Sequence, residues 1–346
     1  MSAPVGKRGF ALPAVLAVTA VVTLVFLVAI LALDSLVQQT RRAVEASRFE
    51  TQALSLEAHA AYLVAVGAPT ADAVLVRDID PRVDARLRID GTSYSTPYAS
   101  PLRLALRDEA GLINLDNLPA SATTRLLAAL GAPVDQRPAL VDRFSDYIDV
   151  DDLARVDGAE APAYRDRRLP PPPDAPLRTI HQALGVLGWK TATPRERWRA
   201  LRDDLTADPT SATININTAT PSALKVMYGL TDDQVAAVLD RRRGLAFTGL
   251  EDLGRAVGLR LSGDAERLYG FPNGRFALKI TALEAGLDYR ARIVLTPRDR
   301  ERPVWIEEPT VSLSPIDERT ERHTDAPLFP DPAPSVADPG RPLRDG

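Results

Sequence analysis

The chain has 346 residues and a formal net charge of −4, which is enough for one membrane segment and one or two further domains. Acidic and basic residues are mixed along most of its length, which argues against a general phosphate-binding surface. The chain has no cysteine, so disulfides, catalytic thiols, cysteine-ligated zinc and iron–sulfur clusters are excluded. Its three histidines lie far apart in sequence and leave little material for a histidine-based metal centre or proton relay.

An uncharged, largely aliphatic segment runs from Phe10 to Leu33. At a rise of about 1.5 Å per residue, a helix of this length spans a hydrocarbon core of about 30 Å. The apolar part of a cleaved secretory signal is only about 7–15 residues long, which does not fit a segment that continues into polar helix at Asp34. Lys7 and Arg8 predict a cytoplasmic N-terminus by the positive-inside rule. We therefore expect a single-pass anchor, with everything after Asp34 on the far side of the membrane.

The short sequence Lys7-Arg8-Gly9-Phe10 resembles the site that prepilin peptidase recognises in type IV pilins and type II secretion pseudopilins. In that family the enzyme cuts after the glycine and methylates the new N-terminal residue. The resemblance implies a processing site between Gly9 and Phe10. Gly9 suits it physically, because it has no side chain to obstruct a protease.

Ala14 is a departure from that family's usual pattern, because most members carry a glutamate at the fifth mature position. A carboxylate in lipid persists only with a partner. In pilins the partner is understood to be the N-terminal amine of the neighbouring, earlier-placed subunit. A subunit with nothing above it needs no such carboxylate, so the departure points to the K-type minor pseudopilin.

The anchor is expected to continue as helix, because apolar residues recur at three- and four-residue spacing until Gly67. An irregular heptad disfavours an isolated coiled coil, the alternative interpretation. Alternating residues then predict strands at 85–89 and 102–106, with a turn at Gly91-Thr92-Ser93.

Residues 116–270 are expected to be mostly helical and to interrupt a small antiparallel sheet, whose strands return between Phe276 and Ile306. The prolines at 170–173 predict a stiff linker between two halves of this insertion. The C-terminal segment is rich in proline and charge and is expected to be disordered. The fold class is therefore α+β, organised as leader 1–9, transmembrane helix 10–33, helix and first strands 34–115, helical insertion 116–270, strands 271–308 and disordered tail 309–346.

An internal echo suggests two related helical units, because Ile113–Leu118 and Ile214–Ala219 share an Ile-Asn pattern before an apolar-periodic helix. Short polar side chains at such positions are typical helix N-caps.

Three phrases, in this order and spacing, are similar to the protein K family of type II secretion: 108–115, 146–164 and 214–224. The resemblance covers roughly residues 5–308. It implies a minor pseudopilin at the tip of the type II secretion pseudopilus, which helps initiate assembly and export folded proteins across the outer membrane. It also implies an inner-membrane protein with a periplasmic domain, whose partners are the I and J minor pseudopilins, other pseudopilins and prepilin peptidase.

A different class of function is suggested by residues 217–253, which resemble a helix-hairpin-helix DNA-binding unit of competence proteins. In that motif a glycine-rich hairpin offers backbone N–H groups to a phosphate. The hairpin here is Gly229-Leu230-Thr231, followed by Asp232 and Asp233, which would repel a phosphate. No nucleic acid is therefore expected as a partner. An enzyme is not expected either, because the sequence lacks nucleophile-elbow, zinc-protease and phosphate-loop motifs.

An acid-rich stretch in the insertion suggests a calcium site. Counted from Asp149, acids fall at positions 1, 3, 9 and 12, which partly matches an EF-hand loop. Leu153 and Ala154 depart from that loop at positions 5 and 6, so a looser oxygen cage is expected, to which Asp146 and Asp152 could contribute. K-type pseudopilins are known as calcium binders, and the resemblance implies that the matching acids bind calcium here. The candidate ligands are Asp149, Asp151, Asp157 and Glu160; a solvated acidic loop is the alternative.

Overall fold

The computed structural model describes residues 11–76, 86–96, 102–211, 214–259, 270–313 and 323–327. The chain divides into two compact units, residues 1–55 and 56–346. The expected processing site, Gly9 and Phe10, and the leader before it lie outside the described residues.

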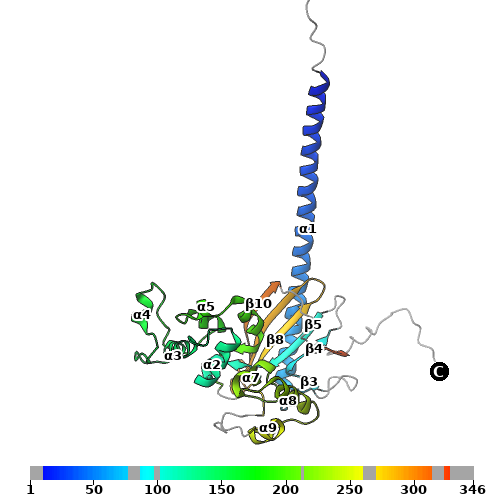
Figure 1. Ribbon diagram of the computed structural model, residues 1–346. Helices are drawn as coiled ribbons and strands as arrows, with labels where there is room; N and C mark the ends of the chain where they lie inside the picture. Colours follow the sequence, from blue (N-terminus) through cyan, green and yellow to red (C-terminus); the bar gives the residue numbers. More distant parts are fainter. Residues whose placement is uncertain are drawn as a thin grey trace, which may run out of the picture. The chain divides into compact units, whose positions relative to one another are not determined.

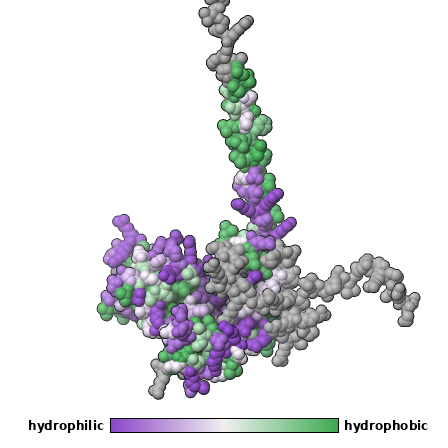
Figure 2. Space-filling view, turned by 45° about the vertical axis from the view of Figure 1, so that its right-hand side comes forward, coloured by the Kyte–Doolittle hydropathy of each residue, from purple (hydrophilic) through white to green (hydrophobic). Residues whose placement is uncertain are grey.

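The first unit is the long N-terminal part of helix α1 (Ala11–Val66). Its most apolar 18-residue window has a mean hydropathy of 3.0 with none of it buried, so by length and composition this helix can cross a membrane. Figure 2 shows the apolar band on its surface, giving way to a polar section further along the helix. The helix is not interrupted within the described range, as its lack of internal glycine and proline after Pro13 allows.

The second unit is built on a six-stranded sheet with the strand order β10-β9-β8-β5-β4-β11. All its neighbouring pairs are antiparallel except β11, which lies parallel to β4. A smaller sheet joins β1, β2 and β3. The strands are β1 (Ala68–Pro69), β2 (Ala73–Leu75), β3 (Arg86–Arg88), β4 (Asp90–Ser95), β5 (Leu102–Asp108), β8 (Arg275–Ala282), β9 (Leu287–Leu295), β10 (Val304–Leu313) and β11 (His323–Pro327).

Strict alternation gives the large sheet one apolar and one charged face. Leu104 of β5, Ile280 of β8 and Tyr289 of β9 lie opposite one another and are buried. On this face the Tyr289 hydroxyl donates to the carboxylate of Glu57, in the last turns of α1. The apolar face therefore packs beside the C-terminal end of α1, which is amphipathic there because Leu56, Ala60 and Leu63 share its buried side.

Arginines occupy the other face of the sheet and meet acids of the helical insertion. Arg107 lies 3.3 Å from Asp204, Arg290 pairs with Asp203, and Arg292 Nε donates to Glu109 Oε1 at 2.6 Å. The period of two that buries the apolar residues necessarily turns these arginines to the opposite side. This charged face positions the insertion on the sheet.

The helical insertion connects β5 to its neighbour β8 (Figure 1), as the sequence predicts. A short parallel pair, β6 with β7, ties together segments nearly a hundred residues apart. The elements of the insertion are η1 (Glu109–Gly111), β6 (Ile113–Asn114), η2 (Leu115–Asn117), α2 (Ala120–Ala129), α3 (Arg137–Ile148), α4 (Ala161–Arg165), η3 (Ile180–Gly185), α5 (Trp189–Ala192), α6 (Arg195–Leu201), η4 (Arg202–Asp204), β7 (Leu205–Thr206), α7 (Pro221–Tyr228), α8 (Asp232–Gly244) and α9 (Leu250–Val257).

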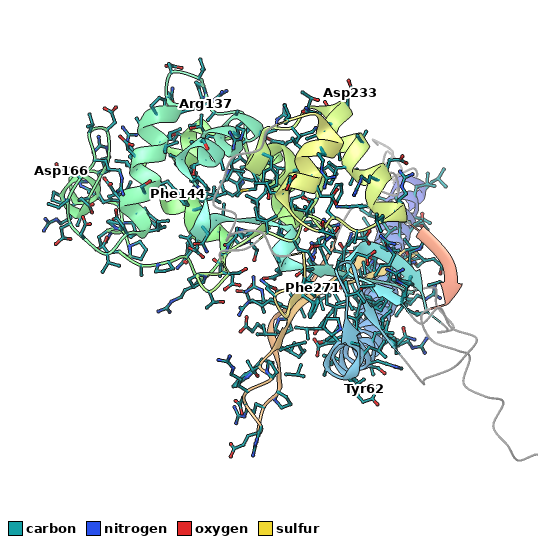
Figure 3. All side chains as sticks on the ribbon, turned by 90° about the horizontal axis from the view of Figure 1, so that it is seen from below. Tyr62, Arg137, Phe144, Asp166, Asp233 and Phe271 are labelled. Carbon is teal, nitrogen blue, oxygen red and sulfur yellow. The ribbon has the colours of Figure 1, made fainter. Side chains whose placement is uncertain are left out.

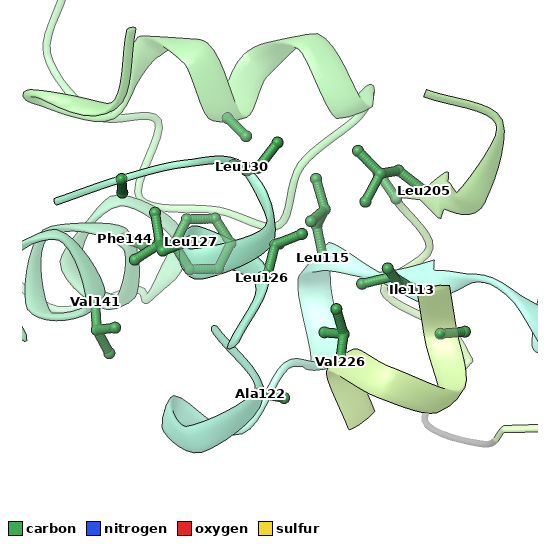
Figure 4. Close-up of a cluster of buried hydrophobic side chains, with 14 of the residues drawn as sticks. Ile113, Leu115, Ala122, Leu126, Leu127, Leu130, Val141, Phe144, Leu205 and Val226 are labelled. Carbon is green, nitrogen blue, oxygen red and sulfur yellow. The ribbon is translucent and has the colours of Figure 1, made fainter. Parts of the chain in front are cut away.

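One hydrophobic cluster runs through the whole insertion, from Ile113 to Leu253. Figure 4 shows the part of it around Leu126 and Phe144. The cluster includes residues before and after the proline run: Phe144 stacks on Trp189 with ring centroids 4.7 Å apart, and Leu187 N donates to Tyr164 Oη. The prolines at 170–173 thus do not divide the insertion into halves, contrary to the sequence-based expectation. They lie within a loop whose two ends pack on the same core, and packing outweighs the local stiffness of the run.

The internal echo corresponds to two helical hairpins, α2–α3 and α7–α8. Asn114 Oδ1 accepts from Asp116 N and Asn215 Oδ1 accepts from Asn217 N, so both asparagines form the same local turn. Arg125 of α2 joins the two hairpins by donating to the carbonyl oxygens of Val226 and Met227, near the end of α7.

The predicted α+β fold is confirmed, with three local differences. β10 extends to Leu313 and β11 covers 323–327, so part of the segment expected to be disordered lies in strands. Gly91 lies inside β4 at a register irregularity rather than in a turn. Its φ of 87° suits a bulge, which needs the same conformational freedom as a turn.

Candidate functional site

The acid-rich loop between α3 and α4 is folded around Asp146, whose side chain is fully buried. Its carboxylate accepts backbone N–H groups from Arg155, at 3.2 Å to Oδ2, and from Ala159, at 2.9 Å. Gly158 allows this wrapping, because a Cβ atom there would overlap Asp146 Oδ2. Asp146 therefore fixes the loop that carries the predicted calcium ligands.

Arg155 provides the nearest positive charge. Its Nη1 lies 2.5 Å from Asp146 Oδ1 and 2.6 Å from Asp149 Oδ2, so one nitrogen bridges two carboxylates. Its side chain is 43% exposed, in contrast to the buried carboxylate of Asp146. The acids beyond these two receive no compensation from this guanidinium in the described contacts.

Glu160 is buried without a compensating partner. The residue is only 7% exposed, and neither carboxylate oxygen has a hydrogen-bond partner among the described residues. Burial, followed by the nearby charges of Asp146, Asp149 and Asp174, raises the pKa of Glu160 to about 7. Asp149 Oδ1 and Asp174 Oδ1 are also buried without partners. Buried, uncompensated carboxylates clustered in this way fit a hard cation such as Ca²⁺.

The structure brings together some of the predicted ligands and separates others. Asp149 and Glu160 interact electrostatically, whereas Asp151 is exposed and accepts from Leu153 N in a local turn. Asp157 is exposed too, and its own backbone N–H donates to Asp142. Asp174 was missed by the sequence reasoning, because it follows the proline run and lies outside any loop spacing.

The acidic side chains do not form a finished metal centre as they stand. Within the part of the chain that the structure describes, no group of three acidic or histidine side chains is close enough to hold an ion. Binding at Asp149, Glu160 and Asp174 therefore requires these side chains to turn toward a common point.

The helix-hairpin-helix segment does not present a phosphate site. Gly229 is left-handed with φ 68° and ends α7, and Thr231 caps α8 by accepting from Gln234 N. Asp232 and Asp233 occupy the first turn of α8, where a phosphate would have to approach. Figure 3 shows Asp233 at this end of the helix.

The arginine run that could have contacted DNA is used inside the protein. Arg241 pairs with Asp252 at 2.7 Å and lies over the Phe247 ring. Arg242 is buried and donates to the carbonyl oxygens of Ile216 and Ala219. Arg243 pairs with Asp240 at 3.0 Å, so all three guanidinium groups have partners within the protein and the run offers little to a nucleic-acid backbone.

One comparison with known proteins covers the region that contains the acid loop. Residues 103–210 match the family model described as "Type II secretion system (T2SS), protein K". This part of the chain is therefore similar to the protein K family. The matched residues include the segment 108–115, helices α2 and α3, the acid loop and Asp174.

A curated relative extends this finding. Type II secretion system protein K of Pseudomonas aeruginosa is 28% identical over 178 residues, 46% of this chain. The chain matches half of that relative's length.

A solved structure bears on the fold. The crystal structure of the GspK-GspI-GspJ complex from the enterotoxigenic Escherichia coli type 2 secretion system covers 80% of this chain and 100% of the matched chain. It aligns with a TM-score of 0.58 and 18% sequence identity, a similarity of fold. The α+β fold is thus shared with a chain of that complex.

Proposed function

We propose that this protein is a minor pseudopilin at the tip of a type II secretion pseudopilus. The observation that carries the proposal is the protein K domain placed as an insertion in a sheet that follows one long apolar helix. Such a protein acts by assembly, helping to start the pseudopilus and to export folded proteins. It has no catalytic role in this proposal.

The anchor and partners follow from the same proposal. The protein sits in the inner membrane by a single helix, with its second unit in the periplasm. Prepilin peptidase processes it between Gly9 and Phe10. Its proposed partners are minor pseudopilins of types I and J, which accompany the K protein in the name of the structural relative.

Co-purification of the full-length protein tests the assignment. The tagged chain, solubilised from membranes, is expected to retain the I and J minor pseudopilins of the same organism. A matched protein bearing only residues 1–55 controls for association through the helix alone. Recovery of no minor pseudopilin would contradict the assignment, and salt-sensitive recovery of DNA would favour the competence-type alternative.

Processing gives a second test. Mass spectrometry of the mature protein is expected to find a methylated N-terminus at Phe10. A mature protein that starts near Asp34 would instead indicate a cleaved secretory signal.

Calcium binding is part of the proposal. Asp149, Glu160 and Asp174 would hold the ion, which would neutralise their mutual repulsion and join the acid loop to the segment after the proline run. This set fits the unpartnered oxygen atoms described above, and Asp151 and Asp157 would at most join from the loop's exposed side.

Calorimetric titration of the full-length protein in detergent tests the calcium site. We expect binding and a rise in melting temperature with calcium, because a ligand of the native state stabilises it by mass action. Both effects should disappear in the double variant Asp149→Ala, Glu160→Ala. The matched double variant Asp151→Ala, Asp157→Ala removes two charges from the same loop and is expected to keep binding. No heat and no thermal shift in the wild-type protein would remove this site.

A further inference from the structure

Arg155 differs from the neighbouring arginines in what its side chain binds. Arg143 Nε donates to the carbonyl oxygen of Asp157, and Arg167 Nη1 donates to that of Ala163. In the described contacts, only Arg155 of these three reaches carboxylates, and it holds both Asp146 and Asp149 through Nη1. Its guanidinium thus occupies one edge of the acid cluster.

Arg155 and a bound cation would compete for the same group. Asp149 Oδ2 accepts from Arg155, while Asp149 Oδ1, Glu160 and Asp174 Oδ1 remain buried without partners. One guanidinium carries a single charge and satisfies only part of the cluster. A divalent ion seated among Asp149, Glu160 and Asp174 would satisfy the remaining oxygen atoms and repel Arg155.

The backbone of the loop is held by hydrogen bonds to Asp146 rather than by apolar packing. Val150, Leu153 and Val156 are 83%, 77% and 97% exposed, so its apolar side chains do not anchor it. The Arg155 backbone N–H makes a separate hydrogen bond to Asp146, at 3.2 Å from Oδ2. The side chain can therefore leave Asp149 without unfolding the loop.

We propose that Arg155 is an internal counter-ion of this site, which occupies Asp149 in the metal-free protein and is displaced when a divalent cation binds. The inference rests on the proposed calcium site and deepens it. The protein pays for cation binding by breaking the Arg155 contacts, so the apparent affinity is reduced by the fraction of molecules in which Arg155 is engaged. Arg155 thereby sets the calcium concentration at which the loop changes partners.

Calcium titration of full-length Arg155→Gln in detergent tests the proposal. Glutamine keeps the backbone N–H that binds Asp146 but removes the competing charge. We expect calcium to bind roughly tenfold more tightly than to the wild type, the scale set by two partly exposed ion pairs. Arg167→Gln is the matched control, since it removes one nearby positive charge that touches no carboxylate in the described contacts, and it should shift affinity far less.

The pattern of binding separates this proposal from the calcium site itself. Equal or weaker binding by Arg155→Gln, with normal binding by the wild type, would overturn the counter-ion role and leave the calcium site standing. Calcium binding by Arg155→Gln alone would support the counter-ion role of Arg155 and would show that the wild-type protein does not use calcium. No binding by either protein would overturn both.

A chemical probe on the wild-type protein avoids dependence on the folding of a variant. Phenylglyoxal modifies accessible arginines, and mass spectrometry can follow each site separately. Calcium is expected to increase modification of Arg155 several-fold and to leave Arg167 unchanged. Unchanged or decreased modification of Arg155, in protein that binds calcium, would overturn the displacement.

Discussion

Asp108 shows how a single buried carboxylate joins the sheet to the insertion. It lies at the end of β5 with its side chain fully buried, and it accepts from Asn215, Thr218 and the backbone N–H of Ala110. Despite these donors, burial dominates and raises its pKa to about 6 from 3.8. The segment 108–115, on which the sequence resemblance partly rests, therefore also connects the sheet to the insertion.

We predict that Asp108 makes the protein less stable as pH rises from 4 to 6. The native state holds the proton more tightly than the unfolded state, so this residue's contribution is most favourable below pH 4 and is lost through pH 6. The shift corresponds to roughly 3 kcal/mol. Urea unfolding of the full-length protein at several pH values should show a flatter profile for Asp108→Asn than for the wild type.

The comparison of slopes matters more than absolute stability in that experiment. Asp108→Asn places an amide nitrogen near the donor of Asn215, which costs about 1–3 kcal/mol at every pH. Only the pH-dependent part reports the ionisation. Parallel profiles for the two proteins would show that Asp108 does not titrate in this range.

Among the elements, the charged face of the sheet is held by contacts between residues that lie far apart in the sequence. Glu109 of η1 is buried, accepts from Thr206 Oγ1 at 2.9 Å and from Arg292 Nε at 2.6 Å, and lies 3.9 Å from Arg275 Nε. It joins β7 of the insertion to β8 and β9. Removing one member of a buried charge network leaves the others uncompensated.

We predict that Glu109→Ala lowers the free energy of unfolding by about 3 kcal/mol. The exposed Glu284, in the turn after β8, is a matched control whose replacement by alanine should change stability by less than about 0.5 kcal/mol. Chemical denaturation of both variants, followed by circular dichroism, provides the comparison. Equal stabilities for the two variants would show that the network does not hold the insertion on the sheet.

The sequence predicted elements well where a local period or cap determines them. The apolar segment and the alternation of β5 and β8 follow from spacing alone. Asn114 and Asn215, in the segments expected to cap α2 and α7, form local turns instead, and the residues at those N-caps are Pro119 and Thr220. Gly91 and the proline run were misjudged, because a bulge and a turn need the same glycine and because packing decides where a stiff segment lies. Of the predicted calcium ligands, Asp149 and Glu160 interact electrostatically, and whether they bind calcium stays a prediction. Asp174 could not be predicted, because only the tertiary fold brings it near Glu160.

At the scale of the whole molecule, the proposed function carries an expectation for where this protein sits in a pseudopilus. Ala14 lies in α1 with an exposed side chain, at the position where the resemblance to pilins would place a glutamate. That glutamate pairs with a subunit added earlier, and an unpaired carboxylate in lipid is costly. The large helical insertion between β5 and β8 also adds volume beyond the sheet that follows α1.

We predict that the protein caps pseudopili and needs no carboxylate at position 14. Ala14→Glu should leave secretion unchanged or reduce it, because the added carboxylate has no amine above it. Gold labelling of the full-length protein on overexpressed pseudopili, viewed by electron microscopy, should mark one end of each filament. A major pseudopilin labelled in the same way controls for access, since it should be marked along the whole length. Labels from this protein at regular intervals along the filaments, or improved secretion by Ala14→Glu, would place the subunit within the filament instead.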